Sequence, residues 1–303
     1  MKPLRLSDNG IVGTVQKIES QVILPETRIQ ATPETGTESC SGALSSEWNI
    51  DEQDELIAAA MCSDWKDVKL SETETENGFT EKKELTLGTE RAVFQVLKKY
   101  NQAPVEYQLF KGVQVNEMTI TMALNSFVTL SFGCLGANHP TSVTDNPLPS
   151  GVTFDPALTT KSFKTLEGYM KIGDDFETLS AMRQCPNFSL SVNNNKERTD
   201  ALFETEAVEM ADGDFVLTGS FDIWKAGDVA RELSNAGIKG KDKCIEVQVS
   251  RTVCNVKSAY TIMLKVHLDD SQEAKDGNKL KNTISFTLNS ADGIKFVKTV
   301  QTV

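Results

Sequence analysis

Carboxylates are the only catalytic residue type that this sequence supplies in sufficient number. Two acidic clusters lie close together along the chain, DEQDE at 51–55 and SETETEN at 71–77. Two carboxyl groups held at a fixed separation across a cleft could cleave a glycosidic bond. Simpler interpretations account for both clusters: DEQDE is typical of a helix start, where the helix dipole favours negative charge, and SETETEN is typical of a solvated loop. We therefore do not expect catalysis from either cluster.

Other catalytic and cofactor patterns are missing from the sequence. There is no GxSxG nucleophile elbow, GxxxxGK[ST] phosphate loop or GxGxxG fingerprint. We expect His139 and His267 to be solvent-facing or hydrogen-bonded, not catalytic. Asp-Gly and Gly-Asn signals at 210–215, 269–279 and 290–295 predict hairpin tips, since they lack the oxygen spacing of a calcium loop. The prediction is that the protein is not an enzyme and needs no cofactor.

The six cysteines contain no CxxC pair, and only two histidines could join them around a metal ion. Structural zinc sites are normally built from closely spaced ligand pairs, so we expect no metal site. The first residues lack the apolar core of a secretory signal, and no stretch approaches the roughly 20 apolar residues that span a bilayer. We expect reduced thiols, no membrane association and a protein completed in a cytoplasm.

The net charge of the chain limits the kinds of partner that the protein is expected to bind. The 303 residues include 31 basic and 43 acidic side chains, for a formal net charge of -12. Residues 47–90 alone hold thirteen acidic and four basic side chains, so the imbalance is concentrated. Nucleic-acid affinity comes from Lys and Arg that displace counterions, and this balance points the other way. The protein is not expected to bind nucleic acid specifically.

Strands must position whatever site exists, because period-two patterns dominate the chain. Only two helices are expected, at 50–62 and 228–236, and irregular chain is expected at 1–38 and in the proline-rich stretch 136–161. The fold class is mainly β. The expected strands cover 82–94, 113–124, 127–132, 187–193, 214–224, 244–253, 260–268 and 283–289.

An internal repeat organises these elements. Gly42 precedes Asp51 by nine residues, as Gly219 precedes Asp228, and each acidic residue opens an expected helix. The order strand, helix, strand, strand follows both times. The repeat predicts an N-terminal arm at 1–38, a first β module at 39–160 that ends in the proline-rich loop 136–161, and a second β module at 161–303. Two unrelated β-rich domains with accidental similarity are the alternative.

With the repeat laid out, the motifs resemble those of tail tube proteins of long-tailed bacteriophages that carry two tandem β modules. The resemblance lies in ordered motifs over about residues 36–300, not in one signature. It implies two β-sandwich or half-barrel modules, each with one short helix, plus the arm and long loops. The motifs are GTESCSGALSSEWNIDEQDELIAAAMCSDW, LTLGTERAVFQV, YQLFKGVQVNEMTITMALNSFVTLSFGCLG, CPNFSLSVNNN and GDFVLTGSFDIW.

The resemblance also implies a function. Subunits of such a family associate into rings, with a hexamer favoured over a pseudo-sixfold trimer, and the rings stack into a tube in the virion, assembled in the bacterial host cytoplasm. Implied partners are a tape measure protein, a tail terminator and baseplate or tail tip proteins, with DNA passing through the lumen without specific binding. Alternatives are the tube protein of a contractile injection system, a β-sandwich adhesin or carbohydrate-binding protein, and a carboxylate-based hydrolase.

The lumen is the surface on which DNA would act. Duplex DNA carries a negative charge about every 1.7 Å, so a basic bore would grip it and an acidic bore would let it slide. We therefore predict an acidic lumen face. The candidate lumen residues are Glu84, Glu106 and Glu117, which lie on or beside expected strands of the first module.

Overall fold

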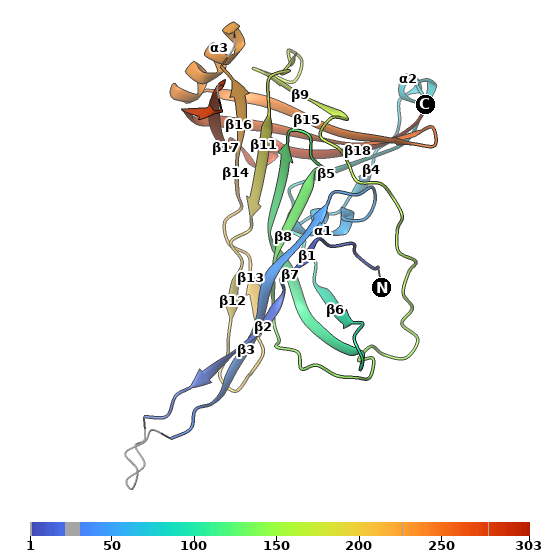
Figure 1. Ribbon diagram of the computed structural model, residues 1–303, viewed down its shortest axis with the longest axis vertical. Helices are drawn as coiled ribbons and strands as arrows, with labels where there is room; N and C mark the ends of the chain where they lie inside the picture. The colour runs from blue at the N-terminus through green and yellow to red at the C-terminus, as the bar shows by residue number, and fades with distance from the viewer. Residues whose placement is uncertain (1, 22–30, 226, 278) are drawn as a thin grey trace.

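A computed structural model describes residues 2–21, 31–225, 227–277 and 279–303 of the chain. Within these residues, one antiparallel sheet of sixteen strands carries nearly all of the regular structure, and a separate two-stranded hairpin and three α-helices complete it (Figure 1). The expected mainly β fold is confirmed. Part of the expected arm, residues 22–30, lies outside the described residues.

The first half of the chain supplies eight strands and two helices. They are β1 Asp8–Asn9, β2 Val12–Ile18, β3 Glu34–Glu47, α1 Asp54–Ala60, β4 Lys66–Asp67, α2 Glu72–Glu76, β5 Phe79–Thr86, β6 Phe94–Tyr100, β7 Glu106–Ala123 and β8 Thr129–Gly136.

The second half supplies ten strands, one α-helix and a 3-10 turn. They are β9 Gly168–Gly173, β10 Ser180–Ala181, β11 Asn187–Asn193, β12 Glu197–Thr199, β13 Glu209–Ala211, β14 Val216–Trp224, α3 Gly227–Ile238, β15 Asp242–Val253, β16 Val256–Asp276, β17 Lys279–Leu288, the turn Ala291–Gly293 and β18 Ile294–Thr302.

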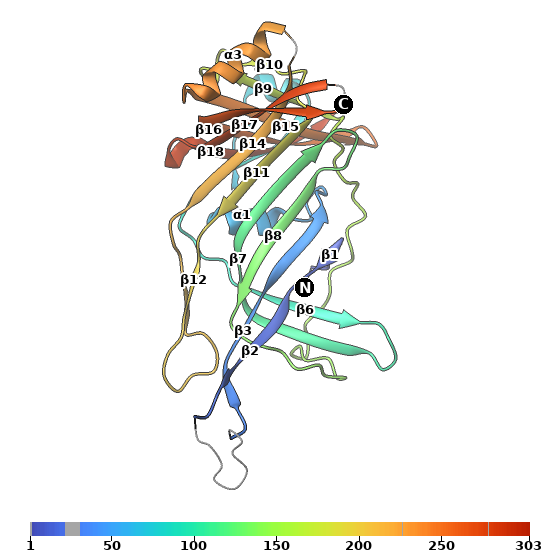
Figure 2. The same cartoon turned by 60° about the vertical axis from the view of Figure 1, so that its left-hand side comes forward.

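The sheet runs without a break from one half of the chain to the other. Its strand order is β1-β3-β8-β7-β11-β14-β17-β16-β15-β9-β10, and β18 lies between β16 and β5. Two strand pairs therefore join the halves: β7 with β11, and β5 with β18. Figure 2 shows β8, β7, β11 and β14 side by side as one surface, below the crossing strands β15 to β18.

The two halves repeat one pairing order. In the first half β3 pairs with β8 and β8 with β7, and in the second β14 pairs with β17 and β17 with β16. A helix follows directly after β3 and again after β14. The repeat expected from Gly42, Asp51, Gly219 and Asp228 therefore has a counterpart in strand pairing. The division into modules at 39–160 and 161–303 stays a prediction.

The core lies where the halves meet. Trp48, at the end of β3, packs its ring 5.0 Å from Tyr260 of β16 and 5.9 Å from Phe163, and all three side chains are fully buried. The helix α1 adds an apolar run from Leu56 to Ala60 to the same core. Aromatic pairs at such distances add to the stabilisation from area burial, so this cluster ties the end of β3 to the second half.

Several expectations need correction in detail. The helix expected at 50–62 begins only at Asp54, because Asp51 has a φ of 63° and cannot continue a right-handed turn. The strand expected at 82–94 ends at Thr86, because the amides of Gly88 and Glu90 bond to the carbonyls of Met61 and Cys62 at the end of α1. Those groups are then unavailable to a sheet.

Two more differences concern turns. The segment 269–279, expected as a hairpin tip, is strand as far as Asp276 and turns only at its end. The acidic stretch at 71–77, expected as a solvated loop, contains the helix α2. The strands β9 and β18 were not expected at all, whereas β11 occupies the range predicted for it. The long segment after β8, around 136–161, is irregular as expected.

Candidate functional site

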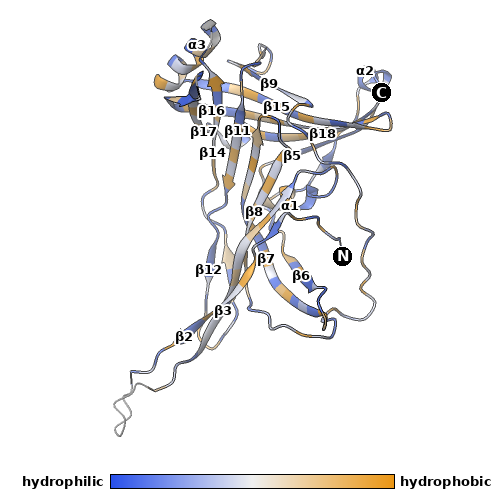
Figure 3. Cartoon of the chain, in the orientation of Figure 1, coloured by the Kyte–Doolittle hydropathy of each residue, from blue (hydrophilic) through white to orange (hydrophobic). Residues whose placement is uncertain are grey.

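One face of the sheet is lined with hydroxyl groups, and the strand period creates it. Along each of the central strands, buried apolar residues alternate with small polar ones, which gives the bands of Figure 3. Because the registers match, the polar residues line up across strands. One row joins six strands with Ser45, Ser131, Thr119, Ser191, Thr218 and Thr287 opposite one another.

A second row runs beside the first. It contains Thr129, Thr121, Ser189, Ser220 and Ser285, and it ends in a carboxylate on each side, Glu47 and Asp270. We call the eleven Ser and Thr residues of both rows the hydroxyl face. All eleven are half-buried or exposed, whereas the intervening side chains form the core.

Two hydroxyl pairs on this face link neighbouring strands. The hydroxyls of Ser45 and Ser131 lie 3.0 Å apart, and those of Thr119 and Ser191 lie 3.4 Å apart. The second pair spans the joint between the two halves. On the reverse side, a Cβ added to Gly219 would come within 2.3 Å of the Phe286 ring, so the glycine lets the core pack closely behind the face.

Charges near the hydroxyl face are few and mostly paired. Asp222 accepts hydrogen bonds from Lys281, Thr283 and Asn187 at 2.6 to 2.7 Å. Burial alone would raise the pKa of Asp222, but these hydrogen bonds outweigh it and lower the pKa. The carboxylate therefore stays ionised and neutralised by Lys281. The face is close to neutral, with carboxylates at its margins.

The three acidic residues predicted for the lumen lie in different places. Glu117 lies on β7 next to the hydroxyl face, exposed, and accepts a hydrogen bond from Asn193 at 3.1 Å. Glu106 begins the same strand eleven residues earlier, roughly 36 Å away at about 3.3 Å per residue. Glu84 lies on β5 and pairs with Lys295 at 3.3 Å. The fold does not gather the three into one cluster.

The carboxylates of 51–55 serve as tertiary contacts. Lys298 of β18 is buried and pairs with Asp51 and with Asp54, whose carboxylate lies 2.6 Å from the amine. Asp54 also accepts a hydrogen bond from the Tyr260 hydroxyl at 2.6 Å. Glu52 is fully buried and pairs with Arg5 at 2.5 Å. These acids are therefore paired with cations or with a phenol hydroxyl, which indicates a structural role. We call the ion pairs of Lys298 with Asp51 and Asp54 the Lys298 lock.

The acids of 71–77 belong to a capped helix. The Ser71 side chain accepts from the Glu74 amide, and the Glu74 carboxylate accepts from the Ser71 amide, forming a capping box. Lys82 donates to Glu74 at 2.8 Å, and this bond together with those from Ser71 lowers the pKa of Glu74 to about 2. The Ser-x-x-Glu spacing was the sequence signal for this helix.

Histidines and cysteines form no reactive site in the part of the chain that the structure describes. His267 lies 2.7 Å from Asp242, and both side chains are largely exposed. All six cysteines are free, and burial raises the pKa of the Cys134 and Cys185 thiols to about 12. The described residues contain no group of three potential metal ligands. Among the described helices, none has the length and apolar content to cross a membrane.

The hydroxyl face was not predicted from the sequence, although the alternating Ser and Thr residues that form it can be seen there. The alternating hydroxyls occur in TLSF, TITM, SLSV and ISFT, each of which was predicted as a strand. What sequence could not supply was the register that brings these residues into two continuous rows. Charged residues can be recognised from the sequence alone, whereas a row of hydroxyl groups can be recognised only when the strand register is known.

Comparison with known proteins identifies one relationship. A family model described as phage tail tube protein matches residues 9–224, which is more than two thirds of the chain and covers the elements from β2 to β14. A comparison with curated proteins finds no match.

Proposed function

Because the chain belongs to the phage tail tube protein family, we propose that its copies associate side by side into rings that stack into a hollow tube in the virion tail. The tube is the conduit through which DNA leaves toward the host. A ring of six is favoured over a pseudo-sixfold ring of three. The partners are a tape measure protein within the tube, and a tail terminator and baseplate or tail tip proteins at its ends.

The observation that carries this proposal is the hydroxyl face. A conduit for duplex DNA must surround a dense line of phosphates without binding them, and a lining of Lys and Arg would bind them by releasing counterions. Neither row of the hydroxyl face contains Lys or Arg. The second row ends in Glu47 and Asp270, and the first row ends beside Asp8 and His267. We therefore propose that the hydroxyl face lines the lumen.

Open strand edges supply a means of ring closure. Within the described residues, β2, β4, β6 and β10 each pair with a single neighbour, so each has one free edge. Free edges invite pairing with another chain, and closing a sheet into a barrel removes them. Side-by-side association of copies would continue the sheet around a ring, with the hydroxyl face turned inward.

The predicted lumen acids fit this orientation unequally. Glu117 lies directly beside the hydroxyl face, so the proposal keeps it as a lumen residue. Glu84 and Glu106 remain candidates that depend on how the ring curves. Glu117→Lys should leave rings intact and slow DNA passage, and Glu84→Lys tests whether β5 also borders the bore.

Electron microscopy of the purified full chain tests the proposal. Rings or tubes with a central channel are the expected result as the protein is concentrated, alone or with tail components added. A species that stays monomeric under all of these conditions would overturn the proposed function.

A further inference from the structure

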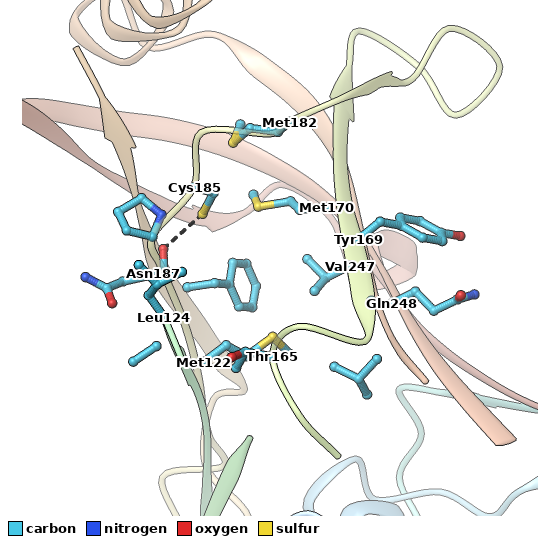
Figure 4. Close-up of a pocket in the computed structure, with 15 residues that line it drawn as sticks. Met122, Leu124, Thr165, Tyr169, Met170, Met182, Cys185, Asn187, Val247 and Gln248 are labelled. Atoms are coloured by element: carbon cyan, nitrogen blue, oxygen red, sulfur yellow. Dashed lines mark hydrogen bonds between the residues drawn. The ribbon is translucent and has the colours of Figure 1, made fainter. Parts of the chain in front are cut away.

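Two apolar features lie far apart along the molecule, an exposed loop tip and an open pocket, and no described part of the same chain covers either of them. One is the tip of the loop between β12 and β13, where Leu202 is 85% exposed and Phe203 is fully exposed. The other is a pocket between the ends of β7 and β11 and the strands β9 and β15 (Figure 4). We call the first feature, Leu202 with Phe203, the knob.

The knob is held in an unfavourable conformation. Phe203 has a φ of 71°, a region that a bulky side chain rarely adopts and that costs on the order of 1 kcal/mol or more. The loop is nevertheless anchored: the Glu38 amide donates to the Thr205 carbonyl at 2.7 Å, and Arg198 donates to the Glu38 carbonyl. The chain therefore holds the Phe203 ring in water, where the ring is not buried against any other part of the same chain.

The pocket has the size and lining for one phenyl ring. Its volume is about 180 Å³, and a cavity of roughly 150 Å³ holds one benzene molecule. Met122, Met170, Met182 and Val247 surround the space (Figure 4). Phe188 also lines it. Methionine sulfur packs well against aromatic rings and adapts its shape to them. Leu124, 59% exposed, lies at the lining and adds apolar surface.

Charge complementarity selects the occupant. The loop that carries the knob holds Glu204 and Glu206, and neither has an ion-pair partner among the described residues. The pocket lining is flanked in sequence by Lys164 and Arg183, next to Thr165 and Met182, and these cations are likewise without an ion-pair partner in the described part of the chain. The two glutamates beside the knob and the two cations next in sequence to the pocket lining carry opposite charges, which attract each other.

The knob cannot reach the pocket of its own chain. Phe188 lines the pocket at the start of β11, and Phe203 follows fifteen residues later along mostly extended chain, roughly 50 Å at about 3.3 Å per residue. Figures 1 and 2 show the β12–β13 hairpin extending from the lower end of β11 and β14, with β9 and β15 at the upper end. The knob therefore lies toward the lower end of the molecule in these views and the pocket toward the upper end.

From these observations we infer that the knob of one copy inserts Phe203 into the pocket of the next copy along the tube axis. Such a contact is heterologous, so it repeats without closing and joins one ring to the next. The inference rests on the proposed function and adds the residues that hold stacked rings together.

Assembly of point variants separates stacking from ring formation. Phe203→Glu should leave the fold and the rings intact but raise the concentration needed for tubes about tenfold or more, because an interface anchor is lost. The control is Val93→Glu, an exposed apolar position on neither surface, which should assemble like the wild type. Tubes of Phe203→Glu that match the wild type overturn the contact alone. A wild-type protein that forms no rings overturns the proposed function and this contact with it.

A charge exchange tests the complementarity. Arg183→Glu and the double variant Glu204→Arg with Glu206→Arg should each weaken stacking, and their combination should restore it in part. A combined variant that stacks no better than the worse parent overturns the role of these charges. Cross-linking gives the geometry: Leu202→Cys with Leu124→Cys, which leaves Phe203 in place, should yield a ladder of oligomers on oxidation. Each single Cys variant controls for the exposed native Cys254, and a ladder no stronger than theirs counts against insertion.

Discussion

At the scale of single residues, Lys298 is the clearest link between the two halves of the chain. Its amine lies over the Tyr260 ring, 5.7 Å from the centroid, and pairs with Asp51, before α1, and with Asp54, the first residue of α1. Burial alone would lower the pKa of Lys298, but the two carboxylates outweigh it and raise the pKa. Removing one partner of a buried pair leaves the other charge uncompensated.

We expect Lys298→Met to lower the free energy of unfolding by about 3 kcal/mol, since Asp54 then stays partly buried without its cation. The contribution is fully present below the ordinary lysine pKa and is lost as pH rises through the raised pKa of the folded state. Urea denaturation at pH 7 and above pH 10 measures both effects.

The control for this variant lies on the same strand. Lys295→Met removes an ion pair with Glu84 that is about one third exposed, so it should cost under about 1 kcal/mol. Equal losses for the two variants would contradict the lock assigned to Lys298.

Residue types alone predicted some of these roles and not others. The carboxylates at 51–55 were assigned to the helix dipole, whereas the structure pairs Asp51 and Asp54 with Lys298. Lys298 is 247 positions from Asp51, and no local pattern connects them. Long-range pairs of this kind follow from strand register, which a single sequence does not fix.

At the scale of elements, α2 is a short helix whose stability depends on pH. Glu74 has a depressed pKa of about 2 because it accepts from Lys82 and from Ser71. A depressed carboxyl pKa contributes stability above its unfolded value, near 4.5, and that contribution is lost as pH falls through the folded value.

Nuclear magnetic resonance titration of the Glu74 carboxyl carbon should therefore give a midpoint near pH 2. Lys82→Met should move the midpoint upward, because the strongest donor is gone. A midpoint that does not respond to this substitution would show that Lys82 is not the cause.

The rows of the hydroxyl face make a second prediction at this scale. Ser191 lies in the middle of one row, on β11 at the joint between the halves. Ser191→Lys should preserve ring and tube formation but slow DNA ejection from phage that carry it, with the delay shrinking as salt rises. The matched control is Thr73→Lys, an exposed position on α2, away from the hydroxyl face. Equal ejection rates for both variants would remove the hydroxyl face from the lumen.

Element by element, the strands whose two faces differ in polarity were predictable. β11 was placed without error because NFSLSVN alternates throughout. β18 was missed because IKFVKTVQT pairs with both β16 and β5, and its Lys295 and Lys298 form ion pairs with carboxylates of neighbouring segments. A strand with one solvent-exposed face alternates apolar and polar residues, and a strand paired on both sides within the fold need not show this alternation.

At the scale of the whole molecule, the continuous sheet bears on how the chain unfolds. The pairs β7–β11 and β5–β18, the aromatic cluster around Trp48 and the Lys298 lock all cross between the halves. The sequence repeat predicts two modules, and these contacts favour their unfolding together.

We expect a single cooperative transition in urea, with far-ultraviolet circular dichroism and tryptophan fluorescence changing at the same denaturant concentration. Trp48 and Trp65 report on the first half, and Trp224 on the second. Replacing Trp224 with Phe isolates the first-half signal. Two separated transitions would instead favour modules that fold independently.

The two hydroxyl rows have a further consequence, which concerns friction. Adjacent strands lie about 4.8 Å apart, so the rows offer a regular grid of groups that bind water and bind phosphate only weakly. A polymer moving over such a grid slides on a layer of water that it does not have to displace. Under the proposed function, the drag on DNA would be set by the viscosity of that layer, so the speed of DNA passage should follow temperature closely and ionic strength hardly at all.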